Sequence, residues 1–115
     1  MLEFGHALEK IIGSVVNLKQ VCKADLQYGD MVFIVTYNSV YSISILENET
    51  YLVSGGWFDR KGQSPQKTNI TGCSWGSNVI KVDILAACGM RLEFGNGVLT
   101  TPIQKIIVLP FNSKN

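Results

Sequence analysis

Hydrophobic residues recur at helical spacing near the start of the chain. They fall on one face of a 3.6-residue period, which is typical of an amphipathic α-helix. This pattern predicts a helix over residues 2–13, ended by Gly13. Because so short a helix is marginal alone, we expect it to pack across a sheet face or a barrel mouth. The apolar residues on this face are Phe4, Leu8, Ile11, Ile12 and Val15.

From residue 29 onward the hydrophobic period changes to two. Residues 31–35 are apolar on both faces, which is typical of a central strand. Residues 40–46 alternate apolar and serine positions, and a polar turn at Asn48-Glu49 leads into a further apolar run. The pattern predicts a three-strand meander within a first β unit at residues 31–54.

A second β unit is predicted over residues 79–109. Residues 79–85 alternate and are rich in β-branched side chains, which favours a strand. A helix over residues 78–88 is the alternative, because an asparagine and a glycine are placed to cap it. Gly95-Asn96-Gly97 indicates a hairpin turn, and residues 103–109 form the last apolar strand.

These elements predict one domain over residues 1–115 that is mainly β, or α+β when the N-terminal helix is counted. Short strands separated by turn signals are typical of a small antiparallel β-barrel or sandwich, here with about 6–7 strands. The polar tail at residues 112–115 is expected to be disordered.

A glycine- and tryptophan-containing segment at residues 54–76 separates the two β units and is predicted to be a loop. It contains both tryptophans and several cations. Cations beside aromatic rings can hold an anionic or planar ligand, and long loops on small β scaffolds often bind partners. In the alternative interpretation the tryptophans are core or rim residues and the loop is solvated. The predicted ligand-binding residues are Trp57, Arg60, Lys61, Lys67, Cys73 and Trp75.

Catalysis is a weaker hypothesis than binding. Cys73 lies in Gly-Cys-Ser-Trp-Gly and is the candidate nucleophile of an alternative, enzymatic interpretation, but a catalytic thiol needs a neighbouring base. The only histidine, His6, is predicted to lie on the solvent face of the N-terminal helix. The chain has no dinucleotide or phosphate-loop motif and no zinc-ligand spacing. We therefore expect no cofactor and favour a protein that is not an enzyme.

The composition of the chain limits the kinds of partner that we expect. Hydrophobic residues make up 46% of the chain and charged residues 17%, so a structural subunit or homo-oligomer is a further alternative. A net charge of +1 gives no general attraction to nucleic acid. No apolar run is long enough to span a membrane. The cysteines Cys22, Cys73 and Cys88 are widely spaced, and we expect free thiols in the cytoplasm.

Overall fold

The structure is a computed structural model, and it describes residues 16–75 and 79–111. The helix predicted over residues 2–13 and the tail at residues 112–115 lie outside these described residues. The described part is mainly β, as predicted, and contains eleven short strands, one 3₁₀ turn and one short α-helix. All strand pairs are antiparallel.

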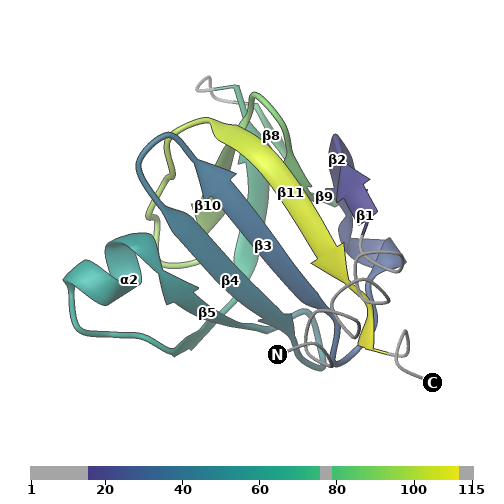
Figure 1. Cartoon of the computed structure of the whole chain (residues 1–115), viewed down its shortest axis with the longest axis horizontal. Coiled ribbons are helices and arrows are strands. Elements are labelled where there is room, and N and C mark those ends of the chain that lie inside the picture. The colour runs from purple at the N-terminus through teal and green to yellow at the C-terminus, as the bar shows by residue number, and fades with distance from the viewer. Residues whose placement is uncertain (1–15, 76–78, 112–115) are drawn as a thin grey trace, which may run out of the picture.

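Six strands form the largest sheet, in the order β1-β11-β3-β4-β5-β6 (Figure 1). The predicted meander is confirmed, because β3, β4 and β5 pair in sequence order. The last predicted strand is also confirmed as β11, which inserts between β1 and β3. The strands of this sheet are β1 (Val16–Leu18), β3 (Met31–Thr36), β4 (Val40–Ile45), β5 (Tyr51–Gly55), β6 (Gln66–Thr68) and β11 (Ile103–Leu109).

Two smaller sheets complete the fold. One contains β10 (Arg91–Phe94), β7 (Ile70–Ser74) and β8 (Ile80–Lys81), and the other pairs β2 (Gln20–Cys22) with β9 (Ile84–Ala87). The strand predicted over residues 79–85 is therefore preferred over the alternative helix, although a turn at Val82 and Asp83 divides it into β8 and β9. The number of strands exceeds the six or seven expected because of this division, because β1 and β2 precede the first predicted unit, and because β6 and β7 lie in the segment predicted to be a loop.

A single core lies between the sheets. Along β3 the side chains of Val32 and Ile34 are fully buried, while those of Met31, Phe33 and Val35 are only partly buried. This alternation follows from the two-residue period of a strand. In Figure 1, β3, β4 and β11 lie side by side in front of β10, and buried residues from all three sheets join one hydrophobic cluster.

A closed barrel, one of the two architectures expected, is not present in the described part of the chain. The two edge strands of the six-stranded sheet, β1 and β6, do not pair with each other. Instead β1 continues into β2 and β6 continues into β7, so each edge passes into a smaller sheet. The single residues Lys19 and Asn69 make these connections.

The segment at residues 54–76 is not the loop that the sequence predicts. It completes β5, forms the helix α2 (Gly56–Arg60) and then contributes β6 and β7. Tertiary contacts overcome the helix- and strand-breaking residues here. Phe58 is fully buried in the core, and Gly72 lies inside β7, where a Cβ atom would strike the backbone of Lys81.

Candidate functional site

Two of the predicted binding residues, Trp57 and Arg60, lie on α2, and a third, Lys61, directly follows the helix. Trp57 is partly buried, and its ring packs edge-on against Phe58 with the ring centroids 5.2 Å apart. Arg60 and Lys61 are exposed, and Arg60 Nη1 donates to Ser39 Oγ at 3.3 Å. Trp57 therefore joins the aromatic core, in agreement with the alternative interpretation of the tryptophans as core or rim residues.

Trp75 lies elsewhere on the molecule. It directly follows β7 and is 67% exposed, with its ring beside Gly89 in the turn between β9 and β10. Ser74, its neighbour in the chain, pairs with Ile80 at the start of β8, and β8 and α2 lie well apart in Figure 1. The two tryptophans therefore do not form one binding surface.

Cys73 is buried and cannot contact a ligand from solvent. Its exposed fraction is 0%, and its thiol donates to the Leu85 carbonyl oxygen at 3.4 Å. Burial raises the pKa of the Cys73 thiol to about 11. A nucleophilic cysteine needs an accessible thiolate, so this environment opposes the enzymatic interpretation.

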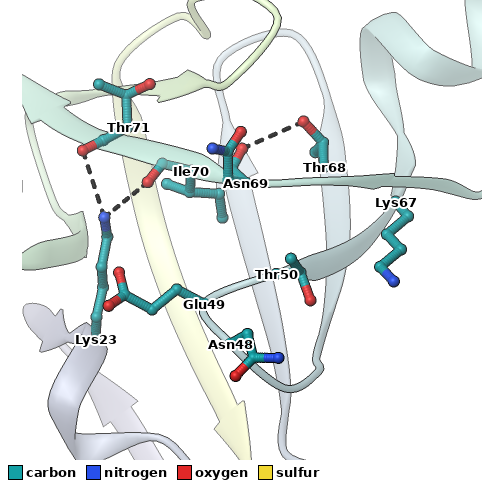
Figure 2. Close-up of a pocket in the computed structure, with 9 residues that line it drawn as sticks. All are labelled: Lys23, Asn48, Glu49, Thr50, Lys67, Thr68, Asn69, Ile70 and Thr71. Carbon is teal, nitrogen blue, oxygen red and sulfur yellow. Dashed lines mark hydrogen bonds between the residues drawn. The ribbon is translucent and has the colours of Figure 1, made fainter.

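The remaining predicted residue, Lys67, lines two of three neighbouring hollows that share lining residues and that together we call the turn groove. The groove surrounds the turn Glu47–Thr50 between β4 and β5. Its three hollows have volumes of about 780, 520 and 320 Å³, and Asn48 lines all three. Each of the three volumes is within the range of about 300–1,000 Å³ that is typical of small-molecule sites. Figure 2 shows the largest hollow, which is lined by Lys23, Asn48, Glu49, Thr50, Lys67, Thr68, Asn69, Ile70 and Thr71.

Lys23 borders the groove from η1 (Lys23–Asp25). Its ammonium group donates to the Ile70 carbonyl oxygen at 2.7 Å and to the Thr71 carbonyl oxygen at 3.4 Å (Figure 2). These bonds fix the long side chain along β7. Because an ammonium group has three donors, one donor remains for a ligand.

The groove carries charges of both signs. Lys67 is exposed at the opposite end of the largest hollow from Lys23, and the Glu49 side chain extends from the turn toward Lys23 (Figure 2). Thr50, Thr68, Asn69 and Thr71 also line this hollow. The floor beside the turn includes Tyr51, whose pKa is raised by burial and, secondarily, by the Glu49 carboxylate.

The turn at the centre of the groove holds two residues in the left-handed region. Asn48 has φ 59° and Glu49 has φ 55°. Two central residues with positive φ are typical of a type I′ hairpin turn, where asparagine followed by glycine is preferred. Asparagine tolerates this region, whereas a glutamate there costs about 1–2 kcal/mol. Backbone strain of this kind often accompanies a binding site.

Sequence reasoning identified part of this groove. It located the Asn48-Glu49 turn and included Lys67, but it missed Lys23, Thr68, Asn69 and Thr71. The turn has a local signal, because polar residues interrupt an apolar pattern. Lys23 has none, since it lies 47 residues before Ile70 and meets it only in the folded chain.

Three further observations concern the described residues alone. Among residues 16–75 and 79–111, no group of three or more histidine, cysteine or carboxylate side chains is arranged to bind a metal ion. No helix in this part of the chain has the length and apolar character needed to cross a bilayer. Its three cysteines are free thiols.

Comparison of the chain with protein-family models, with curated proteins and with solved structures found no match.

Proposed function

We propose that this chain is a non-enzymatic β domain that binds an extended, acidic peptide segment of a partner protein in the turn groove. The single observation that carries the proposal is the convergence of three hollows on Asn48, between the cations Lys23 and Lys67. This choice keeps binding in the segment at residues 54–76 that the sequence singled out. From that segment the groove includes Lys67 and its neighbours on β6 and β7 but neither tryptophan, and the groove itself is centred on the turn Glu47–Thr50.

The polar lining supports a peptide-like ligand. Such a ligand carries carbonyl acceptors for the lysine ammonium groups and N–H donors for the Glu49 carboxylate and the threonine hydroxyl oxygens. An acidic side chain would add a charge-assisted bond to Lys67 or to the remaining donor of Lys23. A ligand without N–H donors would leave Glu49 unmatched.

The backbone of β6 supports an extended conformation for this ligand. β6 is an edge strand of the six-stranded sheet, and its Lys67 and Thr68 line the groove. The free edge of β6 lies opposite β5, and an extended peptide that continues from the groove past Lys67 could add there as a further strand. The Lys67 carbonyl oxygen accepts from the Gln66 side-chain amide at 3.1 Å, a local bond that a partner strand could replace.

The proposal can be tested by selecting peptides that bind the 115-residue chain from a random library and measuring their affinity by fluorescence anisotropy. We expect the selected peptides to be rich in Asp and Glu. Replacing Lys23 and Lys67 together by methionine should weaken their binding by about 10- to 100-fold, because the acidic side chain loses one charge-assisted bond that contributes about 1.5–3 kcal/mol.

Lys81→Met is the matched control, because Lys81 is exposed on β8 in a different sheet. It removes the same charge and should leave the affinity unchanged. Peptides that bind the double variant as tightly as the native protein would refute the proposal. Failure to select any peptide would also count against it.

A further inference from the structure

The six-stranded sheet has a second apolar face, turned away from the core. The side chains of Val32 and Ile34 point inward, so their neighbours in β3 point outward. The same alternation applies to β4, β5 and β11. We call this surface the outward face, and its apolar residues are Met31, Phe33, Val35, Val40, Leu52, Ile107 and Leu109.

Strand register makes this apolar surface continuous across β3 and β11 and from Val35 to Val40, whereas the outward residues Ser42 and Ser44 of β4 separate Leu52 from it. Phe33 lies opposite Ile107, and Met31 lies opposite Leu109 across the β3–β11 pair. Directly opposed side chains on one face are about 4.5–5.5 Å apart at Cβ and therefore touch. Val40, at the end of the surface, is 55% exposed, whereas Phe33 and Ile107 are only partly exposed. Soluble monomers rarely leave a contiguous apolar patch of this kind uncovered.

We propose that residues 1–15 of the same chain cover the outward face. The composition of the chain outside the described ranges supports this choice. Residues 76–78 and 112–115 consist of glycine, serine, asparagine and lysine, so they offer no apolar side chains. Residues 1–15 contain a repeating apolar face that includes Phe4, Leu8 and Ile11.

The chain enters the six-stranded sheet at an edge from which residues 1–15 can reach the outward face. Residue 16 begins β1, which is the edge strand next to β11. Because strands are about 4.8 Å apart, β3 lies about 10 Å and β4 about 14 Å from β1. Fifteen residues span about 22 Å even at the 1.5 Å rise of an α-helix. Residues 1–15 can therefore reach across β11, β3 and β4.

Limited trypsin digestion of the 115-residue chain tests this contact. Mass spectrometry measures the rate of cleavage at the Lys10–Ile11 bond. We expect this bond to resist cleavage in the native protein, because a docked segment is cut only when it opens. Phe33→Ser or Ile107→Ser should accelerate cleavage at Lys10 about tenfold or more, since each weakens the apolar contact. Val82→Ser is the matched control, because Val82 is 61% exposed in the β8–β9 turn.

Equal cleavage rates in native protein and the Phe33 variant would overturn the proposal. So would protection that depends on protein concentration, or a dimer in light scattering that Phe33→Ser dissociates, because a second copy would then cover the face. A photo-crosslinking amino acid at Leu8 gives a test that needs no destabilising change in the sheet. We expect an adduct within the monomer to peptides containing residues 31–35 or 105–109. An adduct elsewhere, between two molecules, or no adduct would refute the contact.

Discussion

The hydroxyl oxygen of Tyr41 accepts a hydrogen bond from the backbone N–H of Trp57 at 3.2 Å. This bond joins the first turn of α2 to β4. The Tyr41 ring also packs on Phe94, with ring centroids 5.4 Å apart, and so connects the six-stranded sheet to β10. Tyr41 thus explains how a short helix is held in a segment rich in glycine.

Removing the Tyr41 hydroxyl should destabilise the packing of α2 without creating a cavity in the core. We expect Tyr41→Phe to lower the free energy of unfolding by about 1 kcal/mol, because the Trp57 N–H loses its partner in a partly buried place. Urea denaturation followed by tryptophan fluorescence measures this change. Tyr37→Phe is the control, since Tyr37 is 73% exposed, and it should have no measurable effect. Equal effects of the two changes would contradict the role of this bond.

Gly56 should be much less replaceable than Gly62, the glycine that follows α2. Its φ is +45°, and a Cβ atom there would overlap the Tyr41 ring. Gly62 also has a positive φ, +67°, but has no atom within 4 Å of its Cβ position. We expect Gly62→Ala to cost about 1–2 kcal/mol from the backbone alone. Gly56→Ala should cost about 1–3 kcal/mol more, because of the overlap with Tyr41. Thermal or urea unfolding of both variants gives the comparison, and equal costs would disprove the steric explanation.

In the strained turn of the groove, introducing a glycine should stabilise the protein, whereas replacing Gly56 or Gly62 should destabilise it. Glu49→Gly should stabilise the domain by about 0.5–1 kcal/mol, because glycine adopts a positive φ without steric cost. Glu47→Gly is the control in the same turn. Glu47 is not among the residues with positive φ, so its replacement should be neutral or destabilising. If Glu49→Gly destabilises the protein, then contacts of the Glu49 side chain outweigh the strain.

The buried Cys73 thiol predicts a loss of stability at alkaline pH. Its pKa rises from 9.0 to about 11 on folding, because of burial. Above pH 9 the unfolded chain releases a proton that the folded protein retains. This contribution is therefore complete below about pH 9 and is lost as the pH rises toward about 11, at up to roughly 1.4 kcal/mol per unit.

Urea denaturation at mildly and strongly alkaline pH tests this prediction by comparison with Cys73→Ala. The variant lacks the thiol, so its deficit in stability relative to the native protein should shrink as the pH rises. Val32→Ala creates a cavity in the core without removing a titrating group, and its deficit should stay constant. Parallel pH profiles for the two variants would show that Cys73 does not contribute.

Local patterns explain which parts of the fold were predictable. The meander from Met31 to Val53 and the strand ending at Leu109 carry clear apolar runs, and adjacent strands pair through short turns. The segment at residues 54–76 was not predictable by the same reasoning. Its glycines and proline resemble loop residues, but buried contacts of Phe58 and the pairing of β7 between β10 and β8 make it part of the scaffold.

The sequence by itself therefore determined a mainly β domain, the hairpin turns and a list of side chains with binding chemistry. Only the tertiary structure decided that Cys73 is buried, that Trp57 and Trp75 lie apart, and that Lys23 and Lys67 border one groove. The physical reason is the range of the interactions. Strand period and turn geometry depend on neighbouring residues, whereas burial and the meeting of charges depend on which distant strands pair.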